Sequence, residues 1–252
     1  MDLSAADYLL ASAAALGAGF VNAIAGGGTL LSFPALLAIG VPAVSANVTN
    51  TTALCPGYFG GTWAQRADLK EQRERARAIV APSVLGGLLG SVLLVISPER
   101  LFRNLVPFLI IGACLLLGLQ DRIKAALPPR RPEPTRPVAL SLRGAVFVSA
   151  IYGGYFGAGL GIISLAVLGL ALDDPLPRLN ALKQLIAASA NVVAATFFLF
   201  SGHVEWALAA AMAPASLVGG QLGGRLVRSI PVKPLRFAVI AFGLAVAVKQ
   251  WL

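Results

Sequence analysis

The sequence is poor in charged residues, and acidic side chains are the scarcer kind. Lys, Arg, Asp and Glu make up 12% of the 252 residues, with 20 basic side chains against 11 acidic ones. Soluble domains carry about 25% charged residues, whereas hydrophobic residues make up 57% of this chain. These values exclude a soluble domain and indicate a polytopic membrane protein.

Cysteine and histidine are also nearly absent. Cys55 and Cys114 both lie inside apolar segments, and His203 is the single histidine. So few thiols argue against a disulfide framework or a thiolate metal site, and we expect no metal and no cofactor. Ser201, His203 and Glu205 lie two residues apart in an expected turn, a spacing that does not form a catalytic triad. The chain is therefore not expected to be an enzyme.

The excess of positive charge has a topological explanation. Three short segments, 66–77, 122–143 and 225–236, hold 15 of the 20 basic residues. The positive-inside rule places all three in the cytoplasm, and nucleic acid is not expected as a partner. Residues 1–7 and 201–205 contain no Lys or Arg and are predicted to be external. Both termini are then predicted to be external.

Apolar segments of about 20 residues, enough to cross roughly 30 Å of hydrocarbon, occur eight times. Two more apolar segments, 29–39 and 160–172, are too short to span alone and are predicted to be half-helices or re-entrant arms. The charged segment ADLKEQRERARA is expected to form either an amphipathic surface helix or a solvated extension of the third span. The eight predicted spans cover about 6–25, 43–64, 78–97, 101–119, 142–158, 181–200, 205–226 and 234–251.

A shift of 133 residues lays the second half of the chain on the first. Gly26 then falls on Gly159 and Asn47 on Asn180, and the offset stays constant for more than seventy residues. This pattern indicates an internal duplication. The charge distribution predicts that the two repeats are inverted, so the fold class is all-α, with about four membrane helices per repeat. The predicted parts are a first transmembrane repeat at 1–119, a cytoplasmic linker at 120–140 and a second repeat at 141–252, with broken or re-entrant helices near 22–40 and 155–172.

Glycines interrupt the apolar pattern at equivalent places in both repeats. Broken backbone at membrane depth is tolerated only where it is buried in protein or lines a cavity, and discontinuous helices are the usual pointer to a transporter's binding site. A half-helix that begins after Gly28 or Gly161 offers free N–H groups and a positive dipole end to an anion. The alternative is that these glycines only allow close helix packing, as we expect for the glycines of 86–90 and 219–224.

Lys183 gives the sign of the expected ligand. It lies about one turn into an apolar span, where a cation costs roughly 2.5–3.5 kcal/mol on insertion scales. No acidic residue lies deep in a span, and the nearest acids in sequence are Asp173 and Asp174. Lys183 is therefore a candidate anion ligand. The alternative is that it reaches the surface or pairs with one of those aspartates.

Polar side chains accompany Lys183 at helical spacing. Asn47, Asn50 and Thr51 share one helix face, and Asn180, Lys183 and Gln184 share another. Such groups donate hydrogen bonds to an oxyanion, although polar contacts between packed helices would need the same residues. The predicted anion site lies between the two faces. Its residues are Asn22, Gly27, Gly28, Thr29, Asn47, Asn50, Thr51, Thr52, Tyr155, Gly159, Gly161, Asn180, Lys183 and Gln184.

Three segments together resemble a known family of bacterial membrane transporters. They read FVNAIAGGGTLLSFPALL, LNALKQLIAASANVVAATFFLFSGHVEW and GGQLGGRL, and their order resembles that of the TauE/SafE sulfite-exporter family over nearly the whole chain. The resemblance implies a duplicated membrane fold that moves small sulfur-containing or organic anions, such as sulfite and sulfonates. It does not identify the substrate.

The expected function is secondary transport of a small anion by a multi-pass protein of the bacterial cytoplasmic (inner) membrane, with the lipid bilayer as its surroundings. Export needs no coupled ion, because a negative-inside potential favours anion exit by about 2.3 kcal/mol per charge per 100 mV. The alternatives are uptake coupled to an ion and a non-transporting membrane scaffold. A homodimer is compatible with a fold of this size.

Overall fold

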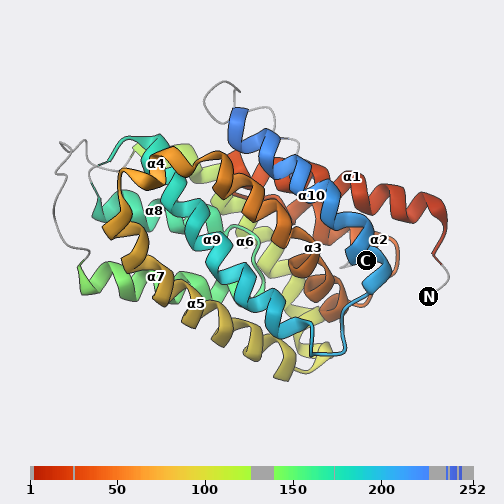
Figure 1. Ribbon diagram of the computed structural model, residues 1–252. Helices are drawn as coiled ribbons and strands as arrows, with labels where there is room; N and C mark the ends of the chain where they lie inside the picture. Colours follow the sequence, from red (N-terminus) through yellow and green to blue (C-terminus); the bar gives the residue numbers. More distant parts are fainter. Residues whose placement is uncertain are drawn as a thin grey trace.

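The computed structural model describes residues 3–24, 26–125, 139–172 and 174–226, together with 237, 239–242, 244 and 245. All regular elements of this part of the chain are helices (Figure 1), which confirms the all-α fold. The ten helices are α1 (Ala5–Ile24), α2 (Thr29–Ala38), α3 (Ala43–Ala64), α4 (Arg66–Lys70), α5 (Arg73–Ile96), α6 (Glu99–Ala125), α7 (Leu140–Tyr155), α8 (Leu160–Ala171), α9 (Leu176–Phe198) and α10 (Trp206–Leu226).

Four of these helices are both long and apolar enough to cross a membrane. They are α1, α5, the segment Glu99–Leu119 of α6, and α9. Helices α3, α7 and α10 coincide with three more predicted spans, but they are shorter or carry more polar residues and glycines. The predicted span 234–251 falls largely outside the described residues.

Two helices extend beyond their predicted limits. Helix α9 begins at Leu176 rather than at residue 181, because Pro175 and Pro177 suit the start of a helix. Helix α6 continues to Ala125, six residues into the predicted linker, since QDRIKA is rich in helix-favouring residues. Residues 126–138 of that linker lie outside the described residues, and α7 begins at its last residue, Leu140.

The charged segment after α3 forms two helical pieces. Arg66–Lys70 forms the short separate helix α4, and helix α5 begins only three residues later, at Arg73. The first turns of α5 therefore extend the third span into the charged region, as one of the two alternatives predicted.

The helix breaks occur where the glycines predicted them. Helix α1 ends at Ile24 and α2 begins at Thr29, while α7 ends at Tyr155 and α8 begins at Leu160. The backbone at Gly26 and Gly159 has φ of 74° and 85°, a left-handed conformation that costs glycine nothing and other residues much. Both breaks are thus built into the chain by glycine.

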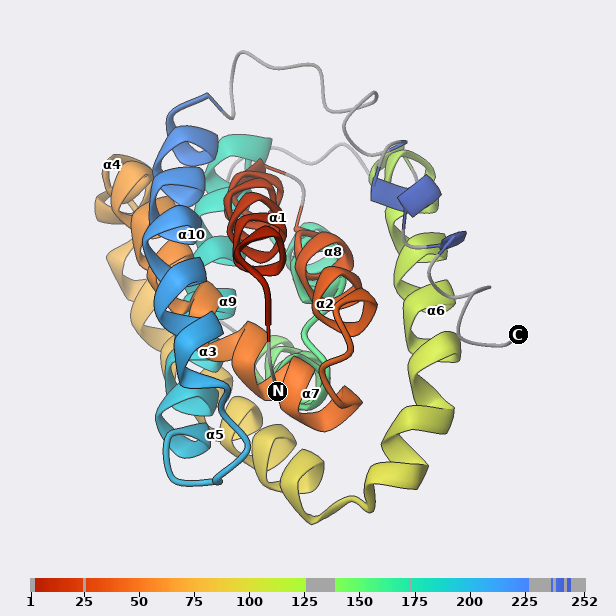
Figure 2. The ribbon, with the colours of Figure 1, turned by 90° about the vertical axis from the view of Figure 1, so that its right-hand side faces the viewer.

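The packing of the helices follows the 133-residue offset. Helix α10 packs on α1 and α3, its counterpart α5 packs on α7 and α9, and α3 contacts α9 in the middle. In Figure 2 the short helices α2 and α8 lie between α10 on one side and α6 on the other. Each half therefore contributes one helix, α5 or α10, that packs against helices of the other half. That the halves are inverted with respect to the membrane stays a prediction.

Glycine makes this exchange of helices close. A Cβ atom on Gly220 would collide with the carbonyl of Gly57, and one on Gly87 would stand 2.7 Å from the Cα of Ala190. Residues 87 and 190 are the 133-residue equivalents of 220 and 57. The small-residue packing expected for 86–90 and 219–224 is confirmed, because these helices approach within backbone contact.

Candidate functional site

The two helix breaks touch each other inside the protein. A Cβ on Gly161, in the first turn of α8, would stand 2.7 Å from the Cα of Gly26 and 3.4 Å from the Cδ of Lys183. The break of the first half, the break of the second half and the Lys183 stem therefore meet at one point. The breaks, which the sequence predicts at equivalent places of the two repeats, are thus in direct contact.

The ammonium of Lys183 is held at the end of α1. The residue is 1% exposed, so the alternative in which its side chain reaches the surface is wrong. Its Nζ donates a hydrogen bond to the backbone carbonyl of Asn22 at 3.2 Å. The last carbonyls of a helix lack intrahelical partners and carry the negative end of its dipole. The C-terminal end of helix α1 thus provides a favourable place for a buried cation.

Asp174, one of the two aspartates considered as partners for Lys183, binds other residues. The Asp174 carboxylate is bound by Arg75 and Arg178, and Asp173 lies outside the described residues. The Asp174 carboxylate is therefore engaged by the two arginines, while the Lys183 Nζ donates to the end of α1.

Asn22 bridges the first break. Its Oδ1 accepts a hydrogen bond from the Gly28 N–H at 2.7 Å, and its Nδ2 donates to the Tyr58 hydroxyl at 3.1 Å. The Thr29 and Asn191 side chains also interact with that hydroxyl. The Gly28 N–H, at the residue that precedes α2, is therefore occupied by Asn22 in this conformation, whereas the amides expected to face an anion follow it.

The polar face of α9 points at the ends of α1 and α3. Asn180 Nδ2 lies 3.2 Å from the Ala23 carbonyl and 2.7 Å from Gln65 Oε1, and Gln184 Nε2 lies 3.5 Å from the Tyr58 carbonyl. We call Asn22, Tyr58, Gln65, Asn180, Lys183 and Gln184 the Lys183 cluster. It joins α1, α3 and α9 through buried polar contacts.

A related contact crosses at the second break, without the charge. Asn47 Nδ2 donates to the Tyr155 carbonyl at the end of α7, at 2.9 Å, much as its equivalent Asn180 donates to the end of α1. Tyr155 contributes this carbonyl, while its ring packs edge-on against Phe102. The position equivalent to Lys183 is Asn50, so the cation belongs to one half only.

The predicted site residues thus fall into several groups. Asn22, Gly28, Thr29, Gly161, Asn180, Lys183 and Gln184 meet in or beside the Lys183 cluster, whereas Asn47 and Tyr155 pair with each other. Gly27 and Gly159 face Leu117 and Ala113 of α6. Asn50 and Thr51 are buried on α3, and Thr52 bonds the Val48 carbonyl of its own helix.

Tyr58 and Gln65 were not anticipated. A signal for both exists in the sequence, because they continue the face of Thr51 at intervals of seven residues, which is nearly two helical turns. Tyr58 is also the 133-residue equivalent of Asn191, which lies on the polar face of α9. The tyrosine was overlooked because its ring counts as apolar in a hydropathy pattern.

Several buried polar atoms near the breaks have no hydrogen-bond partner within the described part of the chain. They are the amide oxygens of Asn47, Asn50 and Gln184 and the hydroxyls of Ser32 and Ser164. Buried polar groups are nearly always paired with protein, water or ligand. Ser164 lies three residues after Gly161 on α8, and Ser32 four residues after Gly28 on α2, so both hydroxyls follow the breaks. The interior therefore holds polar capacity beyond what its own contacts use.

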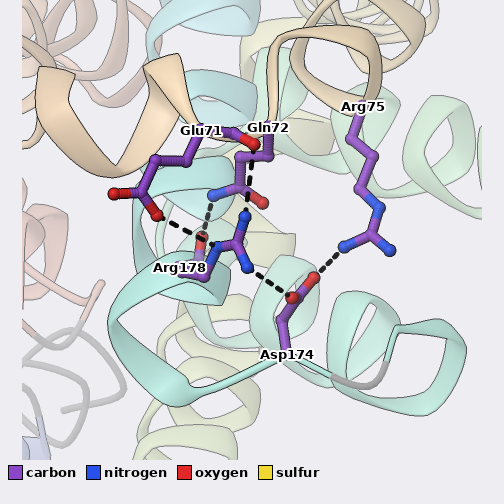
Figure 3. A network of polar contacts seen from close by, with 5 residues as sticks. All are labelled: Glu71, Gln72, Arg75, Asp174 and Arg178. Atoms are coloured by element: carbon purple, nitrogen blue, oxygen red, sulfur yellow. Dashed lines mark hydrogen bonds and ion pairs between the residues drawn. The ribbon is translucent and has the colours of Figure 1, made fainter. Parts of the chain in front are cut away.

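A second polar network lies at the end of the molecule where α4, α5 and α9 begin or end (Figure 3). Arg75 and Arg178 both bind the Asp174 carboxylate, the latter at 3.4 Å. Gln72 Nε2 donates to the Arg178 carbonyl at 2.9 Å, and Arg178 Nη2 donates to the Glu71 carbonyl at 3.2 Å. We call these five residues the Asp174 network. It ties the α4–α5 corner to the start of α9.

Apolar helices and two helix breaks in contact define the class as a multi-pass α-helical membrane protein. The family model described as "Sulfite exporter TauE/SafE" matches residues 11–250. The chain belongs to this family.

Three curated relatives are similar over nearly their full length, and all three carry names of membrane transporters. "Probable membrane transporter protein ORF9" of Sinorhizobium sp is 30% identical over 94% of this chain and 89% of its own. "Probable membrane transporter protein YfcA" of Escherichia coli K12 is 27% identical, over 92% and 85%. A "Probable membrane transporter protein" of Haemophilus influenzae is 31% identical, over 92% and 90%. These names support a membrane transporter.

Proposed function

We propose that the protein is a secondary transporter of small anions in the bacterial cytoplasmic membrane, and that it exports sulfite, a sulfonate or a related sulfur-containing anion. The observation that carries the proposal is the buried ammonium of Lys183, 1% exposed and placed where both helix breaks touch. A cation at membrane depth is expensive and marks a functional site by default. The family to which the chain belongs supports a sulfur oxyanion as the cargo.

The Lys183 cluster supplies the two kinds of contact that an oxyanion needs. Lys183 provides charge-assisted donation, and Asn180 and Gln184 provide neutral amide donors on the same helix face. In the present conformation these donors satisfy backbone carbonyls at the end of α1 and within α3, together with the Gln65 side chain. An anion bound there would take over the donors while the helix ends move apart.

The broken helices support alternating access. Asn22 closes the first break by binding Gly28 and Tyr58 at once, and Asn180 fastens the same end to α9. Each of these bonds is exchanged with a ligand or with water at little net cost, because an intramolecular hydrogen bond contributes only about 0.5–1.5 kcal/mol. Rocking of one half against the other around the touching glycines would expose the cluster to either side.

Export fits these components better than coupled uptake. The membrane potential drives an anion outwards, so a site with one cation and neutral amides is sufficient for export. Uptake against the potential would require a second site for a coupled ion.

Flux measurements on purified protein in liposomes test the proposal. Vesicles loaded with labelled sulfite, methanesulfonate or glycerol are given a potassium diffusion potential through valinomycin, and efflux is followed. We expect saturable efflux of at least one anion, accelerated when the potential drives anions out, with glycerol retained. Anion efflux no faster than from protein-free vesicles would contradict the proposal and favour a scaffold. Anion movement that requires a proton or sodium gradient would favour coupled uptake.

A further inference from the structure

The Asp174 network points to a second anion site on the route to the Lys183 cluster. We propose that Arg75 and Arg178 form a relay site for the transported oxyanion, that the Asp174 carboxylate fills this site in the closed conformation, and that the arriving anion displaces it. This inference rests on the proposed transport of anions and names the groups that the anion meets first.

The carboxylate is built into the arginine pair like a bound ligand. Its two oxygens face different guanidinium groups, Oδ2 towards Arg75 and Oδ1 towards Arg178. The side chains of Asp174 and Arg75 are 3% and 9% exposed, and that of Arg178 is 24% exposed. Guanidinium groups bind carboxylate, phosphate and sulfur oxyanions with the same forked geometry. A sulfite or sulfonate group therefore fits where the carboxylate now lies.

The network is adjacent to the Lys183 cluster along the chain and in space. Arg178 precedes Asn180 by two residues on α9, and Lys183 follows Arg178 by five residues, about 7.5 Å along a helix axis. Gln65, which binds Asn180, immediately precedes α4. The other end of α4 leads through Glu71 and Gln72 into the Asp174 network. An anion that leaves the arginine pair is thus within one or two helical turns of the ammonium.

The 133-residue offset provides an internal control for this corner. The equivalents of Asp174, Arg178 and Arg75 are Val41, Ser45 and Leu208, so the arginine–aspartate contacts have no counterpart at the corresponding corner, where the Glu99 carboxylate accepts a hydrogen bond from the Val44 N–H at 3.4 Å. It is closed instead by buried Val41 and by a hydrogen bond from the Glu205 N–H to the Thr49 hydroxyl at 2.9 Å. The fold therefore closes this kind of corner without an ion network.

Buried ion pairs seldom repay the cost of removing their charges from water, so they are weak evidence for a stabilising role. The charges of Arg75, Arg178 and Asp174 have no equivalents at the corresponding corner, so the fold does not require them. A role in binding the transported anion explains them better. By the positive-inside argument this corner faces the cytoplasm. The Asp174 carboxylate closes this relay site until an anion from the cytoplasm replaces it. Opening of the site is thereby coupled to binding of the anion.

Cysteine reactivity behind the network tests the proposal without requiring transport. Gln65 is a buried member of the Lys183 cluster at the start of α4, which leads to the network. Gln65→Cys, in a protein with Cys55→Ser and Cys114→Ser, therefore reports access to the cluster. The detergent-purified protein is reacted with a cationic methanethiosulfonate, and the modification rate is measured. We expect Asp174→Asn to raise the rate at least about tenfold, since it removes charge-assisted bonds to two arginines.

Glu71→Gln is the matched control. It also removes a carboxylate beside Arg178, but the Glu71 side chain is 68% exposed and its nearest oxygen lies 3.9 Å from Arg178 Nε. We expect its rate to stay within about twofold of the parent, because exposed pairs contribute little. Equal rates for Asp174→Asn and Glu71→Gln would overturn the proposal.

Displacement is tested by adding methanesulfonate to the reporter protein. We expect it to accelerate modification of the parent more than sodium chloride at equal ionic strength, and to have no further effect on Asp174→Asn. The same small acceleration by both salts would overturn displacement. If Asp174→Asn does not fold, Arg75→Gln/Asp174→Asn replaces it, because the double variant buries no unpaired charge. It should be modified rapidly and should not respond to methanesulfonate.

The outcomes that refute the relay site differ from those that refute the proposed transport function. Absence of anion flux in liposomes refutes transport whatever the reactivity of residue 65. Normal flux together with an Asp174→Asn reporter no faster than its parent refutes only the relay site.

Discussion

Replacement of Lys183 by methionine separates the charge of the site from its packing. Methionine keeps an unbranched apolar stem of similar length, which fills irregular space well, and removes only the ammonium. In the structure that ammonium donates a hydrogen bond to the Asn22 carbonyl at 3.2 Å. The folded protein loses that bond but no longer buries a cation 1% exposed to solvent. We therefore expect Lys183→Met to fold and insert normally.

Anion binding should be strongly affected by the same substitution. A charge-assisted hydrogen bond contributes about 1.5–3 kcal/mol, and 1.4 kcal/mol corresponds to a factor of ten in affinity. We expect the apparent affinity for the transported anion to fall by one to two decades. The assay is the concentration dependence of efflux from proteoliposomes, with thermal unfolding as the check on folding. Lys183→Arg, which keeps the charge, should retain more affinity than Lys183→Met.

A folded Lys183→Met protein that transports with unchanged apparent affinity would refute the role of Lys183. The polar faces of α3 and α9 would then be interpreted as contacts between packed helices.

Three further predictions concern packing, the cluster and topology. Gly161→Ala places a Cβ 2.7 Å from the Cα of Gly26 and should lower the free energy of unfolding by about 1–3 kcal/mol. The control Gly112→Ala, whose Cβ would have nothing within 4 Å, should be neutral or stabilising. Equal effects of the two variants in thermal unfolding would contradict the contact between the breaks. Tyr58→Phe removes the acceptor of Asn22 Nδ2 and should lower both stability and apparent anion affinity, while Tyr8→Phe, outside the cluster, should change neither in the same assays. A cysteine in place of Arg130, in the predicted cytoplasmic linker, should resist an impermeant thiol reagent added outside intact cells; its modification there would refute the predicted topology.

The helices and their breaks could be predicted because local chemistry determines them. Apolar runs give the helices, and Gly26 in the first break and Gly157 and Gly159 in the second provide the left-handed conformation that interrupts them. The contact between the breaks agrees with the internal duplication, which puts a break at the same position of each repeat. The helix ends were predicted less accurately: the predicted end of α6 differs from the observed one by six residues, and the predicted start of α9 by five.

The partners of the site residues could not be predicted, because they come from distant parts of the chain. Asn22 was expected in the site, but its bond to Tyr58 depends on how α1 packs against α3. Asp174 was considered as a partner of Lys183, nine residues away, yet it binds Arg75, which is 99 residues away. A one-dimensional pattern identifies buried polar groups and leaves their pairing to the packing of the helices.

The location of the anion tests the account most directly. Selenite is the selenium analogue of sulfite, and selenium scatters X-rays anomalously, so a crystal of the protein with selenite locates the oxyanion independently of the protein model. We expect a strong anomalous peak beside the helix breaks, with a selenite oxygen within about 3.2 Å of Lys183 Nζ, and no such peak in Lys183→Met. The absence of a peak beside Lys183 at saturating selenite, whether or not one lies at Arg75 and Arg178, would contradict the account, and so would a peak at the breaks that persists in Lys183→Met.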